Sequence, residues 1–121
     1  MSAALQAYLR DLKALLEAKD PRSAKLAPAS LLFSFPGDGQ ITIEIGSSTV
    51  RVLEGDRRDR DNVDQRSLMV RTPLSTWLHV CAGELDLDKA DIDMLGDPTL
   101  LSSMARLWEQ KRSGISTRLA R

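Results

Sequence analysis

The chain has 121 residues, the size of one domain with enough apolar side chains to bury a core without disulfides or metals. Its 17 basic and 17 acidic residues give no net charge, which argues against nucleic acid as a partner. With 42% apolar and 28% charged residues, the composition is that of a folded globular protein and not of a disordered tail.

The cysteine content and the hydropathy of the chain bear on its compartment. A single cysteine, Cys81, excludes an internal disulfide framework and indicates a reducing environment. No uninterrupted apolar stretch approaches the roughly 20 residues that a membrane span needs. The N-terminal residues carry charges every few positions, unlike the apolar centre of a secretory signal. We therefore expect a cytoplasmic protein that contacts a membrane at most peripherally.

Residues 1–19 predict an amphipathic helix. Apolar side chains recur at helical spacing, while polar side chains occupy the opposite face. The apolar positions are Leu5, Tyr8, Leu9, Leu12, Leu15 and Leu16. Asp20-Pro21 ends this helix, because the residue before a proline disfavours helical geometry. We expect the helix to lie on the surface, with its apolar face against the rest of the domain.

Three strands are predicted next, at residues 31–35, 41–45 and 49–52, because apolar and polar side chains alternate there. The turn residues PGDGQ join the first strand to the second. A short loop between the second and third strands predicts the register Ile45–Val50, Glu44–Arg51 and Ile43–Val52. Apolar pairs and an opposite-charge pair agree on this register, and a slip of one residue would destroy it.

A charged segment, residues 54–65, is too polar to be buried and predicts a solvated loop. The sequence SLMVR then predicts a fourth strand. Thr72-Pro73 predicts a helix start, because a capping hydroxyl followed by proline is typical of the first helical turn. Gly83 is expected to end this helix. The apolar face of the helix is made by Leu74, Trp77, Leu78 and Cys81.

A last strand and helix complete the predicted order. The sequence DIDM alternates and predicts a short strand with Ile92 and Met94 on one side. Asp97-Pro98 is a second N-cap with proline behind it. The helix that follows has an apolar arc of Leu100, Leu101, Met104, Leu107 and Trp108. The order of elements predicts an α+β domain, with a single, roughly five-stranded, mostly antiparallel sheet and helices packed on one face.

The acidic and nucleophilic residues give no indication of catalysis. The acids of residues 84–97 lack the loop glycine and terminal glutamate of a calcium loop, so we expect a solvated edge or a docking patch for a basic partner. His79, the one histidine, is expected on the polar side of its helix, away from Cys81. The chain also lacks a glycine-rich phosphate loop. We therefore expect a protein that is not an enzyme, with no metal and no cofactor.

Four segments carry a resemblance to a known family: the hairpin ITIEI…TVRVLEG, the helix TPLSTWLHVCAGELDL, the strand DIDM and the helix PTLLSSMARLW. Gly83-Glu84-Leu85 and Gly96-Asp97 stand where the family has two typical turns. In these features the chain resembles the sterol carrier protein 2 (SCP2) sterol-binding domain, found in bacteria and eukaryotes. The resemblance covers roughly residues 28–110. It implies one SCP2-like domain over residues 1–121, with an N-terminal helix at 1–19 and a basic tail at 110–121.

The resemblance implies a non-enzymatic domain that binds or carries a lipid, such as a fatty acyl chain or a sterol, in an apolar cavity between sheet and helices. The candidate ligand-binding residues are Phe33, Ile43, Trp77, Leu78, Cys81, Met94, Leu100, Leu101, Met104 and Trp108. The same residues also suit a plain core, because periodicity does not distinguish a filled core from a lined cavity.

An alternative function follows from the length of one segment. Residues 86–95 are shorter than the corresponding stretch usual in the family, where it helps to wall the cavity. This difference favours an accessory or protein-interaction module that keeps the SCP2-like fold with a reduced or lost cavity. Such a module would bind a protein partner, or a second copy of itself as a homodimer, through an exposed sheet edge or the charged loop.

Overall fold

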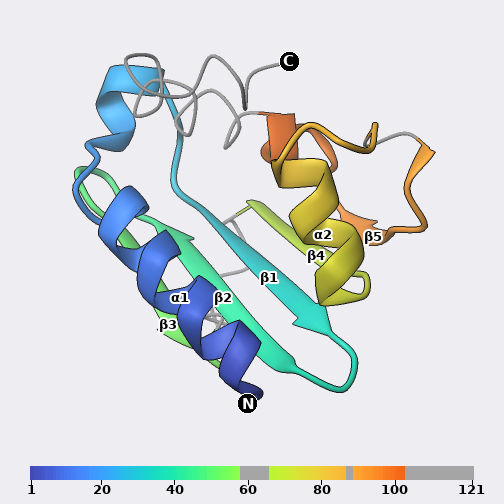
Figure 1. Cartoon of the computed structure of the whole chain (residues 1–121). Coiled ribbons are helices and arrows are strands. Elements are labelled where there is room, and N and C mark those ends of the chain that lie inside the picture. The colour runs from blue at the N-terminus through green and yellow to red at the C-terminus, as the bar shows by residue number, and fades with distance from the viewer. Residues whose placement is uncertain (58–65, 87–88, 103–121) are drawn as a thin grey trace.

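A five-stranded sheet with helices on one side makes up the part of the chain described by the computed structural model, residues 1–57, 66–86 and 89–102 (Figure 1). The elements in chain order are helix α1 (Ala3–Leu16), the 3-10 helix η1 (Pro21–Ala24), strands β1 (Ala29–Phe35), β2 (Gly39–Ile45), β3 (Val50–Glu54) and β4 (Arg66–Arg71), helix α2 (Leu74–Cys81) and strand β5 (Asp93–Gly96). Residues 99–102 are again helical.

The sheet has the strand order β3-β2-β1-β4-β5. β1 pairs with β4 in parallel, whereas β1–β2, β2–β3 and β4–β5 are antiparallel. The predicted α+β class and five strands are confirmed, and the sheet is mixed. The parallel pair arises because the chain crosses from β3, at one edge, to the free side of β1. There Leu68 and Val70 extend the apolar rows that begin at Leu31 and Phe33.

The predicted register of the β2–β3 hairpin is confirmed. Ile43 lies opposite Val52, and Glu44 lies opposite Arg51. The Arg51 guanidinium is 3.7 Å from the Glu44 carboxylate. Both side chains are open to solvent, so the ion pair contributes at most about 1 kcal/mol, and the register depends mainly on the apolar pairs.

Helix α1 lies across β2 and β3 (Figure 1). The helix begins at Ser2, whose hydroxyl accepts a hydrogen bond from the Leu5 amide at 3.1 Å. Leu5, Leu12 and Leu16 are buried against the sheet, as the apolar spacing predicts. The cap satisfies one of the amides that the first helical turn leaves without a partner, which favours the helix start at this serine.

The predicted start of α2 is wrong in one respect. Pro73 is the N-cap, and no side chain caps the helix. The buried Thr72 hydroxyl instead donates to the Asp91 carbonyl at 3.0 Å. A threonine before a proline suits a helix cap, but here the nearby loop supplies an acceptor that the local sequence does not reveal. Thr72 therefore ties the end of β4 to the segment that leads into β5.

Strand β5 begins two residues later than the alternating DIDM pattern predicts. The Ile92 amide bonds to the Ala90 carbonyl in a turn, so Ile92 precedes the strand. Asp97 does cap the next turn, since its carboxylate accepts from the Thr99 amide at 3.0 Å. The rest of the predicted last helix, residues 103–109, and the tail at 110–121 lie outside the described residues.

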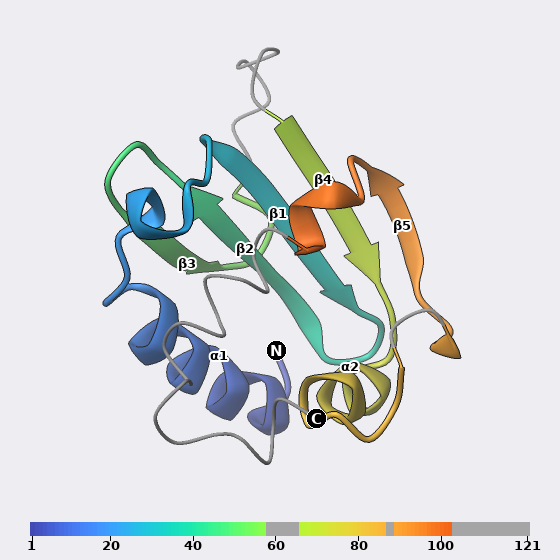
Figure 2. The same ribbon diagram turned by 90° about the horizontal axis from the view of Figure 1, so that it is seen from above.

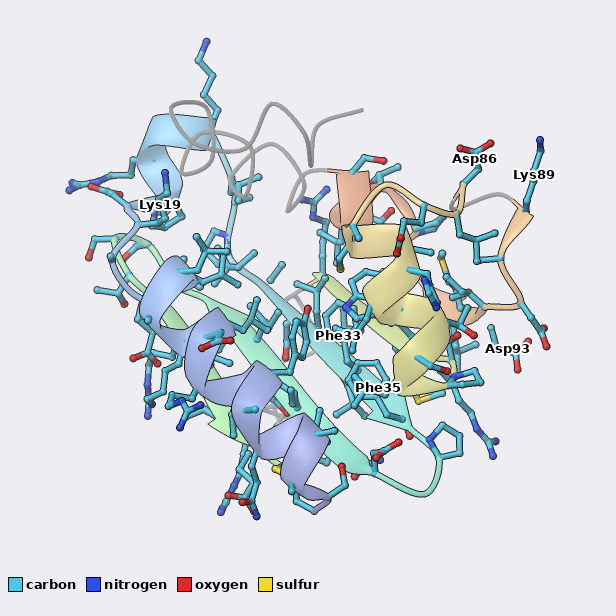
Figure 3. All side chains as sticks on the ribbon, viewed as in Figure 1. Lys19, Phe33, Phe35, Asp86, Lys89 and Asp93 are labelled. Atoms are coloured by element: carbon cyan, nitrogen blue, oxygen red, sulfur yellow. The ribbon has the colours of Figure 1, made fainter. Side chains whose placement is uncertain are left out.

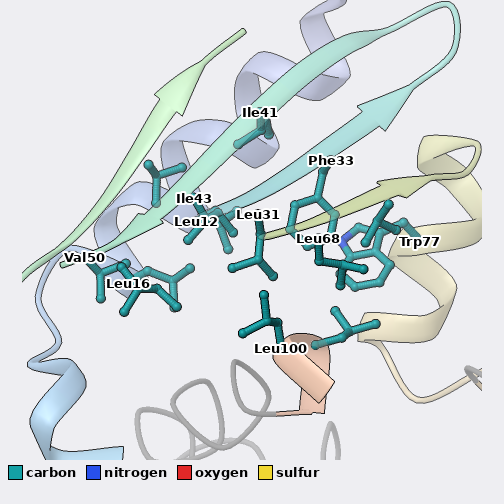
Figure 4. Close-up of a cluster of buried hydrophobic side chains, with 14 of the residues drawn as sticks. Leu12, Leu16, Leu31, Phe33, Ile41, Ile43, Val50, Leu68, Trp77 and Leu100 are labelled. Atoms are coloured by element: carbon teal, nitrogen blue, oxygen red, sulfur yellow. The ribbon is translucent and has the colours of Figure 1, made fainter. Parts of the chain in front are cut away.

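Both labelled α-helices cover the same face of the sheet (Figure 2). The buried side chains of that face form one cluster, in which Leu31, Ile43, Leu68 and Leu100 lie close together (Figure 4). A contiguous layer of aliphatic and aromatic side chains therefore separates helices from sheet. Within the described residues, no helix is long and apolar enough to cross a membrane.

Candidate ligand-binding region

The candidate region is the seam between α1 and α2, over the C-terminal half of β1. Phe33 and Phe35 lie below the seam and between the two helices (Figure 3). Their side chains point to the same face, because residues two apart in a strand do so, and their rings stack with centroids 6.2 Å apart. The floor of the seam is therefore aromatic and fully apolar.

Each helix contributes an aromatic side chain to this floor. Trp77 of α2 packs on Phe33 with ring centroids 5.0 Å apart. Tyr8 of α1 meets Phe35 edge-on at 6.5 Å. Tilted and edge-on geometries are the favoured ones for aromatic pairs, and each such pair adds about 1 kcal/mol to the free energy of burial. The four rings thus connect both helices to the same strand.

A polar contact joins the two helices at the seam. The Trp77 indole Nε1–H donates to the Tyr8 hydroxyl oxygen at 2.8 Å. The Cys81 thiol lies 3.9 Å from the same oxygen and is half-buried. This is a hydroxyl group inside an otherwise apolar region, with the indole and the thiol as its neighbours.

The structure brings together part of the predicted ligand-binding set. Phe33, Ile43, Trp77, Leu100 and Leu101 belong to the buried cluster, and Cys81 packs against it. Met104 and Trp108 lie outside the described residues.

Leu78 and Met94 are more exposed, each at 38%. Leu78 has the helical spacing of Leu74 but sits beyond the edge of the cluster. Met94 is on β5, where the register continues the row of Phe33 and Val70 on the helix-facing side of the sheet. Neither Leu78 nor Met94 belongs to the buried cluster, and their contact with a ligand stays a prediction.

Tyr8 and Phe35 were not among the predicted site residues. The helical spacing of the N-terminal segment does place Tyr8 on the apolar face, and strand alternation places Phe35 with Phe33. Neither signal reveals that the Tyr8 hydroxyl meets an indole 69 residues away. That contact depends on how α1 and α2 are set on the sheet.

The charged residues form local pairs outside the seam. His79 Nδ1 is 2.9 Å from the Glu84 carboxylate on the exposed side of α2. Hydrogen bonds from the Thr99 hydroxyl and amide hold the pKa of Asp97 below its usual value, and the nearby Arg66 acts in the same direction. Among the described residues, no group of three or more histidine, cysteine or acidic side chains is placed to hold a metal ion.

Comparison with known proteins finds relatives only among solved structures. No family profile matches the chain, and no curated protein sequence matches it. The ubiquinone synthesis protein UbiJ-SCP2 superposes with a TM-score of 0.57 and 15% identity, over 88% of this chain and 93% of that one. The stereoselective inverting sec-alkylsulfatase Pisa1 from Pseudomonas sp. superposes with a TM-score of 0.64 and 18% identity.

The two similarities differ in extent. The match to Pisa1 covers 83% of this chain and only 15% of the alkylsulfatase, so the likeness concerns one part of that enzyme. The match to UbiJ-SCP2 covers nearly the whole of both chains. This superposition shows that the chain has the fold of the SCP2-like domain.

Proposed function

We propose that this chain binds a lipid or another ligand with a long apolar chain in the layer between the sheet and the helices. Burial of an alkyl chain on the aromatic floor of Phe33 and Phe35 supplies the free energy of binding, about 0.8 kcal/mol for each CH₂ removed from water. Apolar walls discriminate poorly between chains of similar length, so the selectivity is broad.

The observation that carries this proposal is the hydroxyl in the seam. The tyrosine oxygen accepts a hydrogen bond from an indole of another helix, and such a polar contact, unlike interlocked apolar side chains, can be exchanged for a bond to the polar end of a ligand. An alkyl ligand with a polar end, such as a fatty acid or an alcohol, fits such an arrangement. Phe33 and Phe35 are buried beneath Tyr8 and Trp77, so the two helices separate at the seam to admit the chain, and its polar end meets Tyr8.

The similar structures support the same class of ligand. One is named for ubiquinone synthesis and the other for the cleavage of alkyl sulfates. A quinone and an alkyl sulfate are different chemically, but each name refers to a molecule that an apolar region can hold. The alkylsulfatase name belongs to a chain several times longer than the shared region.

We further propose that binding occurs without catalysis, in the cytoplasm. His79 Nδ1 is 2.9 Å from the Glu84 carboxylate on the exposed side of α2, so the one histidine of the chain makes this contact outside the seam. The single cysteine also suits a reducing compartment.

Cys81 itself provides the test, because it is the only cysteine and lies at the seam. Alkylation by iodoacetamide is measured on the full chain, with and without oleic acid. We expect oleic acid to slow alkylation about tenfold, since a bound chain shields the thiol. The protein is also examined by native mass spectrometry as purified, with organic extraction of any bound lipid.

The matched control moves the thiol to the other side of the sheet. In the double variant Cys81→Ser, Leu95→Cys the single thiol is exposed on β5, and oleic acid is expected to leave its alkylation rate unchanged. Equal protection of both thiols would indicate non-specific association. No protection of Cys81, together with no extracted lipid, would contradict the proposal and favour a protein-interaction module with the same fold.

A further inference from the structure

Strand β5 forms an edge of the sheet whose backbone is open. The Asp97 amide donates to the Ser67 carbonyl at 3.0 Å. In an antiparallel ladder, residues that bond to the neighbouring strand alternate with residues that do not, so this bond fixes which residues of β5 bond to β4. Leu95 therefore directs its N–H and C=O groups to β4, while Met94 and Gly96 direct theirs away from the sheet. Among residues 1–57, 66–86 and 89–102, no strand lies on that side of β5 (Figure 2).

The opposite edge of the sheet is closed by side chains. In β3 the Val52 amide donates to the Glu17 carboxylate at 2.9 Å, and the Val52 carbonyl accepts from the Lys13 ammonium group at 3.4 Å. Both charged groups come from α1. They satisfy the backbone groups that an incoming strand would need, which is a common way to prevent edge-to-edge pairing. No comparable contact protects β5 within the described residues.

The side chains of β5 present apolar surface on both faces of the open edge. Leu95 is 70% exposed, the largest value among the large apolar side chains of the described residues, and Met94 is 38% exposed. Leu95 ends an outer-face row that crosses the sheet through Leu53, Thr42, Leu32 and Met69. Leu32 and Thr42 are buried, so exposure rises along this row toward β5.

The charges around the edge are acidic. Asp91 and Asp93 are exposed, and Asp93 projects away from the sheet at the start of β5 (Figure 3). The basic residues of β4 lie one strand further in, and Arg66 pairs with Asp97 at 3.5 Å. The outermost charges of the edge are therefore carboxylates, which favour a positively charged partner.

A second copy of the chain fits this edge poorly. Antiparallel pairing of two β5 strands can be centred on Met94 or on Leu95. The first register places Asp91 opposite Asp97 of the other copy, and the second places Asp93 opposite Asp97. Like charges directly opposite each other destabilise a strand pair. The acidic edge thus disfavours self-pairing.

We propose that the β5 edge binds an extended segment of a partner protein that carries one apolar and two basic residues at every second position, all on one face of the strand. The segment adds a strand to the sheet, bonds to the backbone of Met94 and Gly96, covers Leu95 with its apolar side chain and places its basic groups near Asp93 and Asp91, because Asp93 and Leu95 lie on the same face of β5. Main-chain bonds supply affinity and the side chains of that face supply specificity, as in other strand additions. This site lies at the edge of the sheet, separated from β1 by β4, and does not depend on lipid binding.

The test uses the full chain and two short synthetic peptides with threonine at every second position; the residues between the threonines are one valine followed by two lysines in the first peptide, and one valine followed by two glutamates in the second. Binding is followed by NMR on isotope-labelled protein. We expect the lysine peptide to bind at least about tenfold more tightly and to shift the Met94 and Gly96 amides most. Equal binding of the two peptides, or shifts centred elsewhere, would overturn the proposal.

Two sets of variants separate backbone pairing from charge. Met94→Pro removes an N–H that faces outward and leaves the β4–β5 ladder its bonds, whereas Met94→Ala keeps the N–H and removes only the side chain. We expect the proline variant to lose binding and the alanine variant to lose only a few-fold. Asp91→Lys with Asp93→Lys should reverse the preference between the peptides.

Analytical ultracentrifugation of the protein alone tests whether a second copy of the chain occupies the β5 edge. A monomer is expected at all accessible concentrations. A dimer that Met94→Pro dissociates would show that a second copy takes the edge, and would overturn the assignment to a basic partner. Failure of peptide binding would leave the protection of Cys81 by oleic acid unaffected, so the two proposals fail separately.

Discussion

The two edges of the sheet differ in how their backbone groups are satisfied. At β3, Lys13 and Glu17 reach down from α1 and bond to both polar groups of Val52. At β5, the described chain offers no such cover, and the adjacent side chains are apolar or acidic. The charged side chains at β3 prevent strand addition at that edge, and the described residues contain no equivalent at β5. The unprotected edge is thus the side of the molecule from which an interaction with another chain is expected.

The largest change is expected from breaking β5 away from the sheet. Gly96 has φ +120°, and a Cβ built there would lie 2.3 Å from the Ser67 carbonyl oxygen and 3.1 Å from the Leu68 Cα. Gly96→Ala therefore combines an unfavourable backbone conformation with a clash against β4. We expect the free energy of unfolding to fall by about 3 kcal/mol, measured by urea denaturation.

Gly55→Ala is the matched control for that variant. Gly55 also has a positive φ of +83°, but a Cβ there would meet nothing within 4 Å. Only the backbone conformation is then unfavourable, and we expect a loss of about 1 kcal/mol. If the two variants were equally stable, close packing of β5 on β4 would not be the reason for the glycine at position 96.

A smaller effect is expected from opening the protected edge. Glu17→Ala removes the acceptor of the Val52 amide. The Glu17 side chain is 32% exposed, so solvent replaces part of the lost bond, and we expect a decrease of about 1 kcal/mol in the free energy of unfolding. The newly open β3 edge should also make the variant associate at high concentration, which light scattering detects.

Glu54→Ala provides the control, because it removes an equal charge from the exposed end of the same strand. We expect it to remain monomeric with nearly unchanged stability. Association of both variants to the same extent would attribute the effect to net charge and would contradict the role of Glu17 in closing the edge.

The smallest effect concerns Asp97, at the end of β5, and depends on pH. Hydrogen bonds from Thr99 lower the pKa of this carboxyl in the folded protein from the ordinary value of 3.8. A lowered pKa means that the carboxylate stabilises the fold above that ordinary value, and that the contribution is lost as the pH falls through the folded pKa. Asp97→Asn should therefore be less stable than the wild type at neutral pH and equally stable in strong acid.

Thermal unfolding at neutral pH and near pH 2 measures this difference. Asp91→Asn serves as the control, since that side chain is exposed and caps no helical turn in the described structure. We expect its melting temperature to follow the wild type at both values. A gap between Asp97→Asn and the wild type that persisted in acid would show that the side chain acts by shape and not by charge.

Local sequence patterns were a good guide where each element is amphipathic. The alternation in β2 and β3 predicts both strands and their register, because a slip would expose every apolar side chain. The spacing of Leu5, Leu12 and Leu16 predicts the buried face of α1 in the same way. Turn and cap positions were less reliable, since Thr72 has the sequence of an N-cap and bonds to a loop instead.

The candidate site was only partly predictable, for a related reason. Apolar periodicity identified Phe33, Ile43 and Trp77, which do lie together. It also selected Leu78 and Met94, which have the right spacing but lie at the surface. Periodicity shows which face of an element is apolar. Whether a residue on that face is buried depends on whether a neighbouring element extends far enough to cover it.

The sequence by itself determined the elements, the hairpin register and the likeness to SCP2 domains, because these follow from contacts between residues near each other in the chain. Tertiary structure decided the parallel pairing of β1 with β4, the meeting of Tyr8 with Trp77, and the contrast between a closed β3 edge and an open β5 edge. Each of these joins segments distant in sequence, so it depends on how whole elements pack on the sheet.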